Sequence, residues 1–109
     1  MEQRLVSAES RKRLELIGSR RSEFADLLEK YAATSPRIFG SVARGTADRQ
    51  SDIDILVDMD PADGNLLMRA SGLMEETRAL FERDDIDIFP IQLLKDRVSK
   101  LALVESIEI

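Results

Sequence analysis

Apolar side chains in the first third of the chain recur with the period of an α-helix. One stripe of a 3.6-residue repeat is made by Ile17, Phe24, Leu28 and Tyr31. This stripe predicts one helix over about residues 7–31, weakened in its middle by Gly18. The sequence Thr-Ser-Pro at 34–36 is expected to end it, because proline interrupts the helical hydrogen bonds.

Farther along the chain, two kinds of pattern predict strands and a second long helix. Short apolar or alternating segments predict strands at 37–39, 52–57 and 85–89, the last ended by Pro90. Alternating spacings of four and three residues predict an amphipathic helix over 64–83, with a stripe made by Leu66, Ala70, Leu73, Thr77 and Leu80. Asp60, or Asp63 with Gly64, is expected to cap that helix.

Three shorter segments complete the predicted order of elements. Residues 42–46 are compatible with a short helix, and residues 106–109 with either an edge strand or a tail. A final helix is predicted by the apolar residues Leu94, Val98, Leu101 and Ala102. The order α-β-α-β-α-β-α predicts one α/β domain over residues 1–109, with a sheet packed by helices.

The composition narrows the class of protein and its chemistry. The longest apolar run is four residues, at 101–104, and the N-terminus lacks an apolar stretch, so we expect a soluble cytoplasmic protein. The chain has no Cys and no His, which excludes thiol nucleophiles, zinc–thiolate sites and Ser-His-Asp hydrolysis. Carboxylates, hydroxyls, Arg, Lys and backbone amides remain, a set that suits hard cations and phosphates.

The charge balance argues against a nucleic-acid-binding protein. The formal net charge is −5. A basic cluster in the first helix consists of Arg11, Lys12, Arg13, Arg20 and Arg21. Because these residues alternate with glutamates, the pattern is typical of a solvated helix face, and we expect no non-specific binding of nucleic acid.

Two aspartates on one predicted strand form the first candidate site. Asp52 and Asp54 are two positions apart, which places both side chains on the same face of a strand. Two carboxylates on a half-buried face repel each other unless a cation lies between them, and Mg²⁺ prefers such oxygen ligands. An isolated pair of this kind is equally compatible with a solvated strand face.

A Gly-Ser pair precedes the two aspartates and adds a candidate phosphate site. Gly40 lets a phosphate approach the backbone, and Ser41 offers a hydroxyl and an amide at the start of the short helix. Alone, Gly-Ser is an ordinary turn. Beside Asp52 and Asp54 it predicts a site for a metal-bound nucleoside triphosphate.

The spacing of these motifs resembles that of a known family. Gly40 and Ser41, followed after ten residues by Asp52 and Asp54, resemble the signature of nucleotidyltransferases with the DNA polymerase beta fold. The segments GSVARG at 40–45 and SDID at 51–54 are similar to the minimal nucleotidyltransferases, the MntA-like antitoxins, and the resemblance covers nearly the whole chain. It implies a small mixed sheet flanked by helices, with the active site on one face.

The resemblance also implies roles for individual residues. Gly40 and Ser41 would hold the phosphates of ATP, and Asp52 and Asp54 would bind Mg²⁺. A second Mg²⁺ would lie between these carboxylates and Asp87, which could also act as general base.

The third carboxylate and the loop residues have competing interpretations. The family pattern selects Asp87, with Asp85 as the alternative, although Asp85 fits a solvated cap at the start of its strand better. Arg44 either neutralises a phosphate oxygen or pairs with Asp48 or Asp52 to hold the loop. Gly45 is expected to meet a requirement of the backbone, and Ser51 is expected to hydrogen-bond to the loop that enters the strand.

The resemblance finally implies a biological role. Such proteins transfer AMP from ATP to a Tyr hydroxyl of a HEPN-domain RNase toxin and thereby neutralise it. Few residues follow Asp87, so we expect a partner protein to supply the acceptor. Two alternatives stay open: an antitoxin that acts by binding alone, and a nucleotidyltransferase acting on a small molecule or RNA. The oligomeric state stays open as well.

Overall fold

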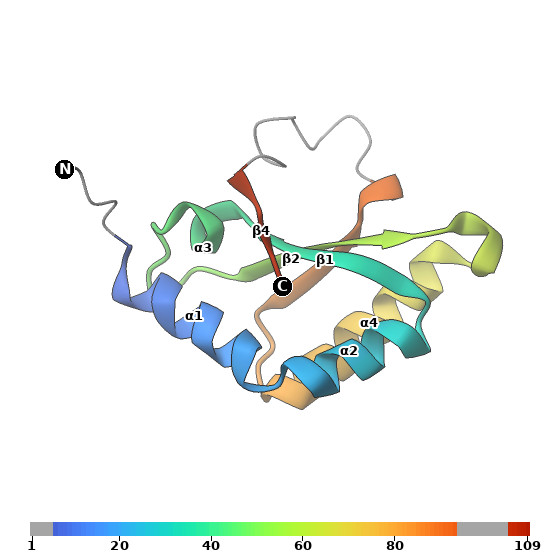
Figure 1. Ribbon diagram of the computed structural model, residues 1–109, viewed down its shortest axis with the longest axis horizontal. Helices are drawn as coiled ribbons and strands as arrows, with labels where there is room; N and C mark the ends of the chain where they lie inside the picture. Colours follow the sequence, from blue (N-terminus) through green and yellow to red (C-terminus); the bar gives the residue numbers. More distant parts are fainter. Residues whose placement is uncertain (1–5, 94–104) are drawn as a thin grey trace.

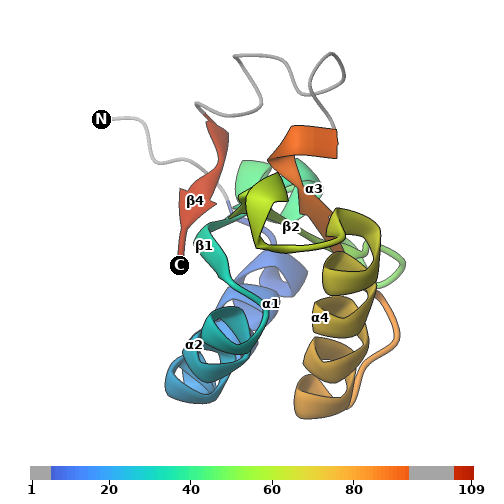
Figure 2. The ribbon, with the colours of Figure 1, turned by 90° about the vertical axis from the view of Figure 1, so that its right-hand side faces the viewer.

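A layer of three helices lies against one face of a four-stranded sheet (Figure 1, Figure 2). The computed structural model describes residues 6–93 and 105–109. Its helices are α1 (Ala8–Ser19), α2 (Arg21–Lys30), α3 (Gly40–Arg44) and α4 (Leu66–Phe81), with short 3₁₀ turns η1 (Pro61–Asp63) and η2 (Ile91–Leu93). Its strands are β1 (Ala33–Phe39), β2 (Ile53–Met59), β3 (Ile86–Pro90) and β4 (Ile107–Glu108). The layer consists of α1, α2 and α4, and α3 directly follows β1.

The sheet is mixed, in the order β3-β2-β1-β4. β2 runs antiparallel to β1 and parallel to β3, and β4 runs antiparallel to β1. The parallel pair needs a crossover connection, which α4 provides. The predicted α/β fold, a small mixed sheet flanked by helices, is therefore confirmed.

The core lies between the sheet and the helix layer. Alternate residues of β2 face the helices and are buried, namely Ile53, Ile55, Val57 and Met59. The predicted helical stripes meet them, since Ile17, Phe24 and Leu28 are buried on one side and Ala70, Leu73 and Thr77 on the other. Phe24 and Phe81 make an edge-to-face contact at 6.2 Å between α2 and α4. The opposite face of β2 carries Asp54 and Asp58.

The single N-terminal helix predicted over residues 7–31 is wrong, because two helices meet at Arg20. Arg20 has φ −127° and ψ 37°, outside the helical region. Next to it, the Ser19 hydroxyl donates to the Leu16 carbonyl at 2.6 Å, a local bond that competes with helical pairing. Gly18 adds the weakness expected of a mid-helix glycine. The observed order therefore begins α-α-β.

Several element ends also differ from the prediction. Asn65 caps α4 by accepting from the Met68 amide at 3.0 Å, whereas Asp60 caps η1 through the Ala62 amide at 2.9 Å. Thr-Ser-Pro at 34–36 lies within β1 and accompanies a register shift, so it distorts this strand rather than preceding it. The short helix predicted at 42–46 begins two residues earlier as α3.

The C-terminal predictions have separate outcomes. Of the two alternatives for 106–109, the edge strand is confirmed by β4. The final helix predicted from Leu94 to Ala102 lies outside the described residues. Among the helices of the described residues, none has both the length and the apolar character needed to cross a membrane.

Candidate functional site

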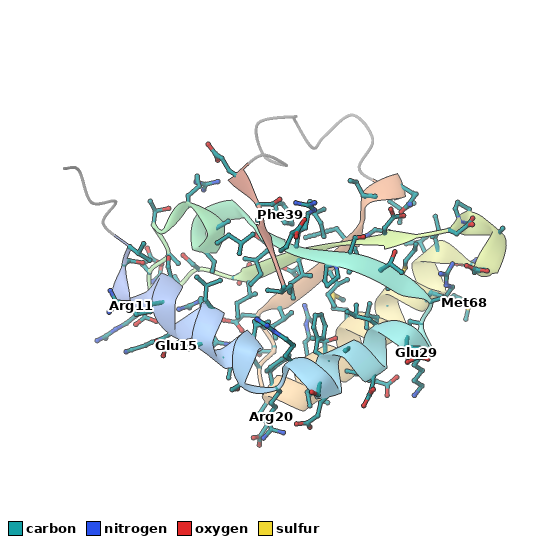
Figure 3. The ribbon with its side chains drawn as sticks, viewed as in Figure 1. Arg11, Glu15, Arg20, Glu29, Phe39 and Met68 are labelled. Atoms are coloured by element: carbon teal, nitrogen blue, oxygen red, sulfur yellow. The ribbon has the colours of Figure 1, made fainter. Side chains whose placement is uncertain are left out.

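Strand pairing places two of the predicted carboxylates next to each other. Asp54 on β2 is the register partner of Asp87 on β3, and on its other side it pairs with Phe39 on β1. Both aspartates are half-buried on the face opposite the helices, because their neighbours in sequence point into the core. Figure 3 shows Phe39 on this same side of the sheet. The face of β1, β2 and β3 opposite the helix layer thus carries the site.

The Gly-Ser turn contacts the Asp54 carboxylate. Gly40 has φ +74°, a conformation that favours glycine, and a Cβ built there would lie 2.9 Å from Oδ2 of Asp54. Gly40 and Ser41 are the first two residues of α3, so their amides belong to the helix start, where N–H groups have no partner within the helix. The structure therefore brings the predicted phosphate-binding residues against a predicted metal ligand.

The pKa of Asp54 reflects its burial and the charged side chains around it. Burial, then the charge of Asp87 and then the charge of Asp52 together raise the pKa of Asp54 from 3.8 to about 6. The Arg44 guanidinium opposes this rise. Asp52 is exposed, one residue before β2. Asp87, Asp52 and Arg44 therefore all lie close enough to influence the charge of Asp54, which is the centre of the candidate site.

Arg44 and Gly45 end α3. Arg44 is the exposed last residue of the helix, and both roles considered for it remain predictions. Gly45 is the C-cap with φ 80°, and its amide donates to Val42 and Ser41 carbonyls. The expectation that Gly45 serves the backbone is confirmed, since this left-handed cap favours glycine.

The structure distinguishes the two candidates for the third carboxylate. Both oxygens of Asp85 accept from Arg83, at 2.7 and 2.6 Å, and this partner lowers the pKa of Asp85. The expectation of a solvated cap is therefore wrong, and Asp85 is already engaged. Asp87 accepts from Arg78 through Oδ1 alone, at 2.9 Å, and lies beside Asp54. Its position favours Asp87.

Arg13 is buried and binds the chain segment before Asp52, a role that the alternation of charges along the helix did not predict. Arg13 is only 3% exposed, and its Nε and Nη2 donate to the Ser51 carbonyl at 3.2 and 3.0 Å. Its Nη1 donates to the Glu9 carboxylate at 2.7 Å. Arg11 and Glu15 do point outward from α1 (Figure 3), but the prediction of a solvated face is wrong for Arg13. The missed signal is its place four residues before Ile17, on the buried stripe.

The loop between α3 and β2 is tied to α1 by two serines as well. The Ser10 hydroxyl accepts from the Ala47 amide at 2.9 Å, and the Ser7 hydroxyl donates to the Ala47 carbonyl at 2.7 Å. Within the loop, the Ser51 hydroxyl accepts from the Asp48 amide at 2.9 Å. The expected bond between Ser51 and the loop is confirmed. The path of the chain into Asp52 is therefore held by α1.

The donor set agrees with the cation that the family implies. The grouped side chains are carboxylates, the oxygen ligands that Mg²⁺ prefers. Across residues 6–93 and 105–109, no three acidic side chains are gathered closely enough to hold a metal ion by themselves. Mg²⁺ is often bound by one or two carboxylates together with phosphate oxygens and water, so the residues present fit a site that the substrate completes.

Comparison with known proteins agrees with this geometry. The family model described as "Nucleotidyltransferase domain" matches residues 22–108. A solved structure described as that of a candidate minimal nucleotidyltransferase superposes with a TM-score of 0.73 at 32% sequence identity, covering 88% of this chain and 95% of the other. No curated protein matches the sequence. Since the match covers most of the chain and the structural relative aligns over nearly its full length, the chain belongs to the nucleotidyltransferase domain family, among the proteins that resemble minimal nucleotidyltransferases.

Proposed function

We propose that this chain transfers AMP from ATP to a hydroxyl of a partner protein, a HEPN-domain toxin, and so acts as an antitoxin. Membership of the nucleotidyltransferase family supports the transfer. The resemblance of the segments at 40–45 and 51–54 to those of MntA-like antitoxins supports a protein acceptor. The observation that carries the proposal is the contact of Gly40 with the Asp54 carboxylate, beside Asp87. A phosphate-binding turn and an acidic pair share one small area of the sheet.

The residues divide the work of an in-line transfer. The amides of Gly40 and Ser41 bind oxygens of the triphosphate, and Arg44 contributes a positive charge nearby. Asp52 and Asp54 would hold one Mg²⁺, with a second between them and Asp87, and the bound metal would supply neutralisation of the triphosphate charge. Asp87 accepts the proton of the acceptor hydroxyl.

The chemical balance of the reaction needs no further reactant. The acceptor oxygen forms a bond to the α-phosphorus of ATP, and the bond from that phosphorus to the bridging oxygen of pyrophosphate breaks. AMP remains on the acceptor, pyrophosphate leaves, and the hydroxyl proton passes to Asp87. We propose a Tyr hydroxyl as the acceptor, following the resemblance. Catalysis then depends on positioning and charge stabilisation, with no covalent enzyme intermediate.

Mass spectrometry of the partner tests this proposal. The product of the adjacent gene, which we expect to be a HEPN-domain protein, is mixed with a substoichiometric amount of this chain, Mg²⁺ and ATP. We expect each partner molecule to gain the mass of AMP and to keep it after the two proteins are separated. Asp54→Asn should abolish the gain. Asp58→Asn, on the same face of β2 but exposed at its far end, is the matched control and should not.

Two results would contradict the proposal in different ways. An unmodified partner that regains full RNase activity after separation would indicate an antitoxin that works by binding alone. AMP recovered in a small molecule or in RNA, with the protein partner unmodified, would indicate a different acceptor class.

A further inference from the structure

We propose that Arg78 is a positioning residue that sets the direction of the Asp87 carboxylate, a role that rests on the proposed function. Arg78 lies on α4, in the helix layer, whereas Asp87 lies on the face of β3 opposite that layer. β3 is an outer strand of the sheet. The Arg78 side chain therefore reaches from one layer past the strand edge to the other face.

The backbone of β3 fixes one end of this contact. Carbonyls of successive strand residues point alternately to the two sides, and the Asp85 carbonyl points toward β2, where it accepts from the Ile53 amide at 2.9 Å. The Ile86 carbonyl therefore points off the free edge of the sheet. Arg78 Nε donates to this carbonyl at 2.7 Å. The guanidinium plane is thus held against the residue that precedes Asp87.

The other end of the contact reaches the carboxylate. Arg78 Nη2 donates to Oδ1 of Asp87 at 2.9 Å. Because the guanidinium is planar and already bonded to the main chain, this second bond restricts rotation of the Asp87 side chain. A lysine in its place, with a single nitrogen at the end of a flexible chain, could not reproduce this fork.

Repulsion within the site explains why Asp87 needs such a restraint. Asp54 and Asp87 are register partners with like charges, and an unrestrained Asp87 would rotate away from Asp54. Arg78 offsets the charge of Asp87 from the strand edge and holds Oδ1. Within the described part of the chain, Oδ2 accepts no hydrogen bond, so it stays available for a proton or a cation.

A second arginine, between α4 and β3, shows the contrast. Arg83 engages both oxygens of Asp85, at 2.7 and 2.6 Å, and leaves neither available. The two pairs have similar exposure, with arginines at 33% and 31%. Arg78 differs because one of its bonds goes to the main chain, which leaves one carboxylate oxygen for the site.

Three variants test the role through the kinetics of AMP transfer to the partner. Arg78→Met should lower kcat by about 10–100-fold, the usual effect of removing a residue that orients a metal ligand, with little change in KM for ATP. Arg78→Lys should recover only part of kcat. Arg83→Met, the matched control, should leave kcat and KM unchanged. Thermal melting of each variant in EDTA checks that the fold is intact.

Binding of Mn²⁺, followed by electron paramagnetic resonance with ATP present, gives a measurement independent of turnover. Arg78→Met should weaken Mn²⁺ binding at the Asp87 side, whereas Arg83→Met should match the unmodified protein. Unchanged kcat and Mn²⁺ affinity in Arg78→Met would overturn the proposal, as would equal losses in Arg78→Met and Arg83→Met. If the unmodified protein transfers no AMP, the proposed function fails, and the Mn²⁺ measurement alone still decides the role of Arg78.

Discussion

Asp54 and Asp87 are direct register partners in the parallel pairing of β2 and β3. Neighbouring strands lie about 4.8 Å apart, so strand pairing itself places two like charges side by side before any substrate binds. Burial, together with the charge of Asp87, raises the free energy of the ionised form of Asp54 in the free protein. Grouping these carboxylates therefore lowers the free energy of unfolding of the metal-free protein, and this cost can be measured.

Asp54→Asn should stabilise the metal-free protein at neutral pH. Burial and neighbouring charges raise the pKa of Asp54 from 3.8 to about 6, so the folded state binds the extra proton between these values. The stability of the unmodified protein thus falls as pH rises toward 6. Removing the charge should restore on the order of 1–3 kcal/mol above that pH, and almost nothing near pH 4.

Thermal melting in EDTA across this pH range measures the effect. Asp58→Asn, at an exposed position of the same strand, should show no such pH-dependent gain. A melting temperature of Asp54→Asn that falls below that of the unmodified protein at neutral pH would mean that this carboxylate supports the fold.

Gly40→Ala should lower both stability and nucleotide binding. Its φ of +74° costs a side-chain-bearing residue about 1–2 kcal/mol, and the added methyl would displace the Asp54 carboxylate at 2.9 Å. Urea unfolding and calorimetric titration with Mg²⁺ and ATP measure the two losses. Gly18→Ala is the control, since a Cβ there would meet no atom within 4 Å beyond its chain neighbours and its own helix backbone, and it should stabilise α1 by about 0.5–1 kcal/mol. If Gly40→Ala binds Mg²⁺ and ATP as well as the unmodified protein does, the turn at Gly40 is not part of the nucleotide-binding site.

Arg13→Met should destabilise the protein and weaken the binding of Mg²⁺ and ATP, although Arg13 lies outside the site. The change leaves the Ser51 carbonyl without its donors, a loss of about 1–3 kcal/mol, and frees the chain segment that leads to Asp52. Binding of Mg²⁺ and ATP should weaken along with stability. Lys12→Met, whose side chain is 71% exposed on the same helix, should change neither. Equal melting temperatures for the two variants would show that Arg13 does not brace the loop.

ATP should bind far more weakly when divalent cations are removed. In EDTA the carboxylates repel the triphosphate and the positive charge of Arg44 offsets this only in part, so we expect a loss of affinity of at least about tenfold, or about 1.4 kcal/mol. Calorimetry with Mg²⁺ and with EDTA measures the difference. The double variant Asp52→Asn with Asp54→Asn should bind ATP with little dependence on Mg²⁺. Equal affinity for the unmodified protein in both buffers would rule out a metal bridge.

Local patterns were sufficient for most of the fold and for the residues of the site. Alternation in 53–57 predicts which side of β2 is buried, and the two-residue spacing places Asp54 on the other side. Helical stripes predicted the packing faces of α2 and α4 correctly. These features depend on residues close together in the chain, where period and turn chemistry decide the outcome.

Relationships between distant segments could not be predicted in the same way. The register that sets Asp54 against Asp87 depends on how two strands align across a helix. Arg13 looked solvated because Glu9 stands four residues before it, and only the fold brings the Ser51 carbonyl to its other side. In both cases the decisive partner comes from the packing of distant segments. The error at Asp85 is of another kind, because its partner Arg83 lies only two residues earlier and the side-chain conformation decides that they pair.

The edges of the sheet have a consequence for self-association. Exposed strand edges invite pairing with strands of other molecules, and aggregation follows. On one side, β4 pairs with Arg37 and Ile38 of β1, the Ile109 amide binds the Pro36 carbonyl, and Pro36 itself has no N–H to offer. On the other side, Arg78 occupies the outward carbonyl of Ile86. The edge strand beside β1 is only two residues long, and a side chain occupies one outward carbonyl of β3, so both sides of the described sheet offer a foreign strand little uninterrupted edge.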